Sequence, residues 1–318
     1  MKKIFVVALL CMGMLPFTAV DSVAQHYGVD GISINYCESQ LKNSNLVTTR
    51  KFTPKAFQTL HASTAVEVVY TSTPSQKAQV KVIVTREYAD YLVAEVSYGG
   101  ALNIYWDTKR LKHDFKRKKF DLVARIEVNA PAPDVIKSES GASVSIPQTL
   151  SLSNRLTVNA TSGSEIEVGN IECASLNAST TSGASFEVKS ARCTTVKVSA
   201  SSGSEVDIEN LNVSKSVDLC ASSGSKVESK NLSGEANIIA NASSGSSISL
   251  SGKTNGETSL EASSGAIIEA YDLQVPFATA NASSGSKVKA PKAKELQIKE
   301  ESSGDVHWKG KPTVTKIK

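Results

Sequence analysis

A Ser-Gly pair recurs along the chain at nearly constant spacing, and this feature limits the possible folds more than any other. The glycines are Gly141, Gly163, Gly183, Gly203, Gly224, Gly245, Gly265, Gly285 and Gly304. Their successive separations are 22, 20, 20, 21, 21, 20, 20 and 19 residues. A period of about 20 residues indicates a stacked repeat protein, in which each repeat buries its apolar face only against its neighbours.

Apolar and small residues keep fixed positions relative to each glycine, and their alternation predicts short strands with one buried face. Around Gly203 these residues are Val196, Val198, Ala200, Val206, Ile208, Leu211 and Val213. The alternation breaks between Ile208 and Leu211 and again before the next block, so each repeat has three strands and three corners. We therefore predict an all-β fold, a parallel β-helix with about 20 residues and three short strands per coil. The extra residue of the 21-residue coils should fall after the last apolar pair of the coil, which around Gly203 is Leu211 and Val213.

The Ser-Gly pairs are expected to form a narrow structural corner. The pairs are Ser162 and Gly163, Ser182 and Gly183, Ser202 and Gly203, Ser223 and Gly224, Ser244 and Gly245, Ser264 and Gly265, and Ser284 and Gly285. Glycine allows a positive φ or a close approach of two backbones. Strand parity predicts that the serine before each glycine points inward, as does the small residue after it. Stacked hydroxyls would then satisfy one another along a buried column.

Four regions are expected. Residues 1–24 are typical of a signal peptide, because Met1-Lys2-Lys3 precedes an apolar stretch and Ser22-Val23-Ala24 offers small residues for cleavage; a membrane anchor or a lipid on Cys11 is the alternative. Residues 25–122 should form a β-rich N-terminal cap with irregular first coils, with strands near 66–70, 80–84, 92–96 and 102–106 and a helical turn near 86–92. Residues 123–304 form the regular solenoid, and 305–318 a C-terminal cap.

Charge and cysteine content narrow the possible partners. The formal net charge of +4 is too mild to indicate a nucleic-acid partner. No apolar run after residue 24 is long enough to span a membrane, so no transmembrane segment is expected in the mature chain. Cys173 and Cys193 share an inward phase on adjacent coils, which suits either a disulfide or a buried pair of thiols. A pairing of Cys37 with Cys220 also stays open.

Carboxylates form the main candidate binding site. Outward parity places them on one face of adjacent coils, and they are Glu165, Glu167, Glu187, Glu205, Asp207 and Glu228. They form either a solvated face or a stripe that binds Ca²⁺, a cationic group or a sugar; Lys226 and Ser249 interrupt it. No histidine pair has zinc-ligand spacing and no nucleophile motif occurs, so we predict no catalytic residue and no cofactor, with Ca²⁺ the only metal considered.

A second candidate is the basic segment Lys109–Lys119. It is expected to be an exposed hairpin or loop, and its functional alternative is a patch for lipopolysaccharide or acidic glycans.

Further residues carry a family resemblance. The stretch Phe57–Trp106 includes VEVVYTSTPSQKAQVKVIV and YLVAEVSYGGALNIYW, and it continues through Val128-Asn129-Ala130-Pro131 into ESGASV and the SGS repeats. Over residues 48–310 the chain resembles the head GIN domain family of secreted bacterial proteins, described as "putative auto-transporter adhesins". The resemblance implies a right-handed β-helix of pectin-lyase-like architecture with an adhesive role, and it brings no catalytic residues.

Together these features predict an exported, non-catalytic envelope or cell-surface protein that binds a surface glycan or a protein through its outer faces. Its expected location is the periplasm, the outer-membrane surface or the extracellular space. Two alternatives remain open. One is a carbohydrate-active enzyme, because polysaccharide lyases and hydrolases also use β-helices. The other is a purely structural scaffold.

Overall fold

The computed structural model describes residues 25–29, 31–36, 40, 41, 43, 45–74 and 77–317. Its N-terminal part contains β1 (Gln25–Val29), β2 (Ile32–Tyr36), β3 (Val47–Phe52), β4 (Thr59–Ser63), β5 (Glu67–Ser72), β6 (Gln79–Thr85), the 3-10 helix η2 (Arg86–Tyr91), β7 (Leu92–Val96), β8 (Ala101–Trp106), α1 (Thr108–Phe115) and β9 (Lys119–Asp121). The expected strands and helical turn of this region are thus present. The expected signal peptide, a lipid on Cys11 and the pairing of Cys37 lie outside the described residues.

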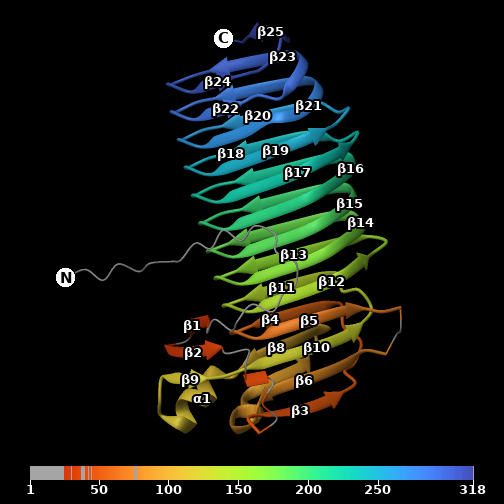
Figure 1. The fold of residues 1–318 in the computed structure, drawn as a ribbon, viewed down its shortest axis with the longest axis vertical. Helices are drawn as coiled ribbons and strands as arrows, with labels where there is room; N and C mark the ends of the chain where they lie inside the picture. Colours follow the sequence, from red (N-terminus) through yellow and green to blue (C-terminus); the bar gives the residue numbers. More distant parts are fainter. Residues whose placement is uncertain are drawn as a thin grey trace, which may run out of the picture.

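The remaining chain is a continuous stack of strands. It comprises β10 (Ala124–Ala130), β11 (Val135–Glu139), β12 (Ser143–Ser151), β13 (Arg155–Thr161), β14 (Glu165–Thr181), β15 (Ser185–Ala200), β16 (Glu205–Ala221), β17 (Lys226–Gly234), β18 (Asn237–Ala242), β19 (Ser247–Lys253), β20 (Thr258–Ala262), β21 (Ile267–Ala282), β22 (Lys287–Lys289), β23 (Lys292–Glu300), β24 (Asp305–His307) and β25 (Thr313–Lys316). Figure 1 shows these strands rising as a prism, with the N-terminal elements at its base.

Each coil has three faces, as expected, and every strand pairs in parallel with its equivalent in the next coil. In β14 and β15, for example, Glu165 lies beside Ser185, Asn170 beside Ser190 and Ser175 beside Thr195. The first face comprises 165–168 and its equivalents, the second 170–173 and the third 175–181. The predicted parallel β-helix is therefore confirmed.

The core is a continuous column of the predicted inward side chains. The inward side chains are fully buried, for example those of Leu156, Val158, Val206 and Ile208. The extra residue of the coil that begins at Gly203 also falls where it was expected, because the register shifts between Cys193 and Thr195. Burial of this stacked apolar column is the main stabilising force of the solenoid.

The corner differs from the prediction in one respect: the serine before each glycine points outward. Ser162, Ser182, Ser202, Ser223, Ser244, Ser264 and Ser284 are all exposed. Both residues of the pair are left-handed, with φ of 57° at Ser162 and 67° at Gly163. Two successive left-handed residues turn the chain and suspend the alternation of a strand. The predicted inward column of these hydroxyls is therefore wrong.

Backbone hydrogen bonds and a different serine stabilise the corner instead. The N–H of Gly163 donates to the carbonyl of Ser182 in the next coil, at 3.0 Å. The small residue after the glycine is buried, as predicted. At Ser246 its hydroxyl accepts from the N–H of Ser243 at 3.1 Å and donates to the carbonyl of Ala221 at 2.8 Å.

The corner motif is shifted by one residue at the C-terminal end of the stack, and it also occurs without glycine near the N-terminus. In the last turn the left-handed pair is Ser302 and Ser303, and Gly304 takes the place of the buried small residue. The assignment of Gly304 as a marker in phase with the others was wrong by one residue. Near the N-terminus, Thr64 and Ala65 form the same left-handed pair without glycine, and the N–H of Ala65 donates to the carbonyl of Ser140.

The N-terminal elements change the direction of pairing. β6 is antiparallel to β3 and β10, and β7 is antiparallel to β8, while β4 still pairs in parallel with β11. β1, β2 and β9 form a separate small sheet beside α1. At the other end β24 and β25 continue the parallel pairing. None of the helices in the described part of the chain is long and apolar enough to cross a membrane.

Candidate functional site

The candidate carboxylates lie on the first face and form a column in register. Glu167 pairs with Glu187, Glu187 with Asp207, and Asp207 with Glu228 on successive coils. Glu165 and Glu205 lie two residues earlier in their strands and face the same way. The sequence-predicted residues are therefore brought together.

Lysines neutralise one half of this stripe. Lys226 lies 2.8 Å from Glu205 and 2.9 Å from Glu228, and Lys230 lies 2.9 Å from Asp207. Although partial burial acts in the opposite direction, these lysines lower the pKa of Glu228. Among the described residues, no lysine forms an ion pair with Glu165 or Glu187. Burial, and after it the negative charge of Glu165, raises the pKa of Glu187.

This arrangement bears on the metal alternative. In the part of the chain that the structure describes, no group of three or more His, Cys, Asp and Glu side chains is arranged to hold a metal ion. Binding of Ca²⁺ to the stripe stays a prediction from the sequence. The two lysines make its second half a mixed-charge surface.

Beyond Glu228 the same face is hollowed into a shallow trough. In β19 the outward residues are Ser247, Ser249 and Ser251, whose side chains are short. The flanking coils carry much longer side chains at the equivalent positions. The trough has a volume of about 180 Å³ and is lined by Glu228, Ser229, Lys230, Ser249, Leu250, Ser251, Glu269, Tyr271, Asp272 and Lys289.

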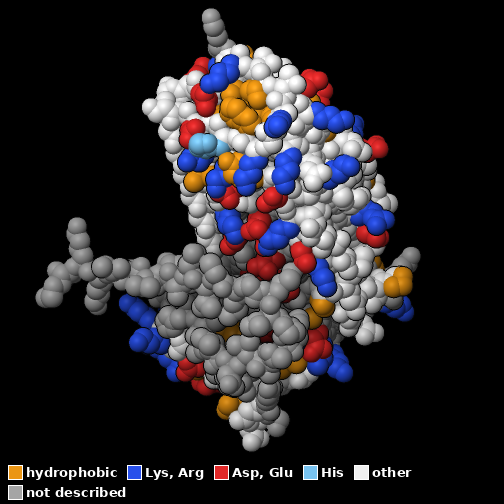
Figure 2. Space-filling view, turned by 45° about the horizontal axis from the view of Figure 1, so that its top comes forward, with side chains coloured by type: hydrophobic (Ala, Val, Ile, Leu, Met, Phe, Trp, Pro, Cys, Tyr) orange, Lys and Arg blue, Asp and Glu red, His pale blue; other side chains and the backbone are white. Residues whose placement is uncertain are grey.

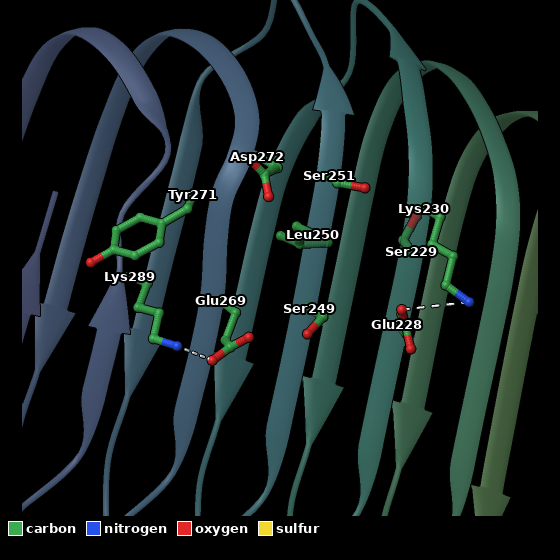
Figure 3. Close-up of a pocket in the computed structure, with 10 residues that line it drawn as sticks. All are labelled: Glu228, Ser229, Lys230, Ser249, Leu250, Ser251, Glu269, Tyr271, Asp272 and Lys289. Carbon is green, nitrogen blue, oxygen red and sulfur yellow. Dashed lines mark hydrogen bonds and ion pairs between the residues drawn. The ribbon is translucent and has the colours of Figure 1, made fainter. Parts of the chain in front are cut away.

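The two walls of the trough combine charged groups with one aromatic ring. Figure 3 shows Glu228 and Lys230 on one side of Ser249, and Glu269, Tyr271 and Lys289 on the other. Lys289 forms an ion pair with Glu269. The ammonium of Lys309 lies 4.3 Å from the centre of the Tyr271 ring, which is a cation–π contact.

Sequence reasoning recognised that Ser249 interrupts the acidic stripe but missed the trough. The available signal was three successive outward serines in one coil between coils with long outward side chains. On the upper half of the molecule, acidic and basic side chains lie intermixed with apolar ones (Figure 2). Carboxylates that accept, ammonium groups that donate and a ring edge suit a polar ligand rich in hydroxyl groups.

The cysteines lie away from the trough. Cys173 and Cys193 stack on the second face as predicted, with their sulfur atoms 3.5 Å apart, and they are free thiols, as is Cys220. The hydrogen bond between the two thiols and burial raise the pKa of Cys193, whereas the same hydrogen bond lowers the pKa of Cys173. Both side chains are buried among the apolar residues of the solenoid, so this pair packs as part of the core.

Comparison with known families identifies one match. The family model described as "Putative auto-transporter adhesin, head GIN domain" matches residues 56–232 and 228–312. These ranges cover most of the chain, including the trough and every regular corner. No curated protein matches the chain.

Solved structures show the same fold. A "putative lipid binding protein" from Parabacteroides distasonis has a TM-score of 0.62 at 16% identity, covering 86% of this chain and 98% of that one. A "putative adhesin" from Parabacteroides merdae has a TM-score of 0.61 at 13% identity, covering 84% and 98%. Another from Parabacteroides distasonis has a TM-score of 0.59 at 12% identity, covering 83% and 97%.

Proposed function

Since this chain belongs to the family described as "putative auto-transporter adhesin, head GIN domain", we propose that it is an exported, non-catalytic surface protein that binds a glycan in the trough over Ser249. The observation that carries the proposal is the trough itself. It runs along β19, with Glu228 on one side and Glu269 and Tyr271 on the other, and the Tyr271 ring extends toward the coil of Lys289. Family membership supports a surface location, and the expected signal peptide supplies the route of export.

The lining of the trough favours a sugar over a lipid. One structure of this fold is titled a lipid-binding protein, and an acyl chain requires apolar walls. Here the walls are Glu228, Lys230, Glu269 and Lys289, while Leu250 is buried beneath the serines. Sugar hydroxyls both donate and accept, so they match this alternation of carboxylates and ammonium groups, and an aromatic ring can cover the apolar side of a pyranose.

A carbohydrate-active enzyme is the second candidate. Glu228 and Glu269 lie on either side of the trough, two coils and therefore about 10 Å apart, which is near the separation used by inverting glycosidases. A general acid requires a raised pKa. The pKa of Glu228 is lowered by Lys226 and Lys230, and Glu269 is paired with Lys289. These ion pairs favour binding without turnover.

The test is a glycan array probed with the wild-type protein and three variants. Tyr271→Ala removes the ring, and Ser249→Arg fills the trough. Tyr98→Ala removes a fully exposed tyrosine from the turn between β7 and β8 and serves as the matched control. We expect the first two variants to lose at least about fivefold in affinity, and Tyr98→Ala to bind like the wild type.

Other outcomes would contradict this proposal in distinct ways. Binding that survives Ser249→Arg would place the ligand on another face. Release of reducing sugar or unsaturated product, abolished by Glu228→Gln or Glu269→Gln, would establish the enzyme. If the wild-type protein binds no glycan and instead binds another protein, the ligand is a protein and the proposed sugar ligand is wrong.

A further inference from the structure

The segment 109–119 is the most highly charged part of the molecule. It contains seven Lys and Arg residues and one acidic residue, Asp114, giving a formal charge of +6, which exceeds the +4 of the whole chain. The prediction that it forms a hairpin or loop was wrong, because Thr108–Phe115 form α1. Asp107 accepts a hydrogen bond from the N–H of Arg110 at 3.0 Å and caps the helix. Figure 1 shows α1 projecting from the side of the prism near β1, β2 and β9.

The apolar side of α1 fixes the helix to the protein. Leu111 is fully buried, and Phe115 makes edge contacts with the rings of Tyr88 and Phe120. The guanidinium of Arg117 lies 4.9 Å from the centre of the Phe120 ring. The guanidinium of Arg110 similarly lies over the ring of Tyr91. Both arginines therefore contact aromatic rings of the protein itself.

The lysines remain available. Lys109, Lys112, Lys116, Lys118 and Lys119 are all exposed. Among the described residues, no carboxylate lies within ion-pair distance of any of the five. Three acidic groups of this end have other partners: Asp114 accepts from Tyr91 at 2.8 Å, Asp121 from Asn35 at 2.8 Å, and Asp90 pairs with Arg50 at 2.7 Å.

From this separation of charge we propose that the five lysines dock the protein onto an anionic lipid surface. The ammonium groups are exposed on a projecting segment, so they can approach a plane of phosphate headgroups together, and each adds electrostatic attraction to an anionic lipid surface. Leu111 and Phe115 are already packed inward, so the helix binds the surface through charge without inserting. The base of the prism then faces the membrane, and the trough lies several coils of about 4.8 Å away from it.

The test is co-sedimentation of the full chain with lipid vesicles. We expect the protein to bind vesicles of phosphatidylcholine mixed with phosphatidylglycerol and not vesicles of phosphatidylcholine alone. Binding should be lost near 1 M salt, where the Debye length falls to about 3 Å. Replacing all five lysines by glutamine should lower the affinity at least about tenfold. Replacing them by arginine should preserve it.

A second variant separates position from net charge. Changing Lys189, Lys215, Lys253, Lys294 and Lys311 to glutamine removes the same charge from exposed lysines of the solenoid away from the base, none of which lines the trough. This control should bind as the wild type does, and far-ultraviolet circular dichroism should show that both glutamine variants are folded. Equal losses in the two variants would overturn the proposal, as would equal binding to neutral vesicles. Retention on an acidic polysaccharide without binding to vesicles would also overturn it, in favour of a glycan partner. Because the trough is not altered, these results do not depend on the glycan test.

Discussion

At the scale of single residues, the corner is defined by a buried hydroxyl and two left-handed residues. Ser246 bonds the backbone of its own coil and that of the coil before it. Sequence parity predicted the burial of this residue correctly, because it follows the turn and begins a strand. It failed for Ser244, whose outward direction depends on a φ of 52° that the pattern does not encode.

The first prediction concerns this hydroxyl. Ser246→Ala removes one donor and one acceptor from a buried site, so it should lower the free energy of unfolding by about 1 kcal/mol. Ser247→Ala, one residue later on the outer face, should change it by less than about 0.5 kcal/mol. Urea unfolding of both variants measures the difference. An equal effect at the two positions would contradict the assigned role.

The second prediction contrasts two glycines. A Cβ at Gly245 would meet nothing within 4 Å, and only its φ of 70° opposes substitution. Gly245→Ala should therefore cost about 1 kcal/mol and Gly245→Asn less, since Asn tolerates this conformation. At Gly252 a Cβ would lie 2.2 Å from the carbonyl oxygen of Leu232, so Gly252→Ala should cost about 3 kcal/mol. Thermal and urea unfolding test this order, and similar costs for both alanines would contradict it.

At the scale of elements, strands are periodic and were predictable, whereas helix α1 was not. The outward residues of each first-face strand meet their equivalents on the next coil, so charge along the column depends on neighbours about 20 residues away in sequence. Glu187 lies between Glu167 and Asp207, while Glu228 lies between lysines. A glutamate at this position of the strand therefore stabilises the pairing of strands in one coil and destabilises it in another.

The third prediction is an opposite pH dependence of two variants. The pKa of Glu187 is raised, so its ionised form opposes folding above that pKa, and Glu187→Gln should raise the free energy of unfolding at pH 7 by a few tenths of a kcal/mol. The pKa of Glu228 is lowered, so its carboxylate contributes stability that is lost as the pH falls through that pKa. Glu228→Gln should therefore lower the free energy of unfolding at pH 7.

Urea unfolding at pH 7 and at about pH 3 measures both effects. Each difference from the wild type should shrink as the pH falls and the carboxyl groups become protonated, and that of Glu228→Gln should persist to a lower pH because the pKa of Glu228 is lowered. Changes of the same sign at pH 7 would show that the two glutamates share one environment.

At the scale of the whole molecule, contacts join only adjacent coils, so the solenoid is nearly one-dimensional. Its two ends differ: antiparallel strands and α1 lie at the base, while β24 and β25 continue the parallel stack. This polarity separates the basic helix from the trough along the long axis (Figure 1).

The fourth prediction tests this independence of coils. Deletion of residues 188–207 removes 20 residues and joins Glu187 to Ile208, which preserves the inward direction of Ile208. The variant should fold, with an unchanged circular dichroism per residue and a length shorter by about 4.8 Å in small-angle scattering. Deletion of residues 188–206 instead joins Glu187 to Asp207 and turns that aspartate inward, so this variant should fail to fold. A folded product from both deletions would contradict the proposed register.

The sequence alone determined the architecture, because equivalent positions of successive coils in a parallel solenoid have the same burial, so the period of the coils appears as a period in the sequence. The nine marker positions, the three apolar pairs per coil and the place of the extra residue could all be read in this way, apart from the one-residue offset at Gly304. Only the tertiary structure decided where side chains of different coils meet. The trough over Ser249 depends on side chains of neighbouring coils, and the exposed lysines of residues 109–119 depend on a helix that the repeat does not contain, so periodicity predicts neither.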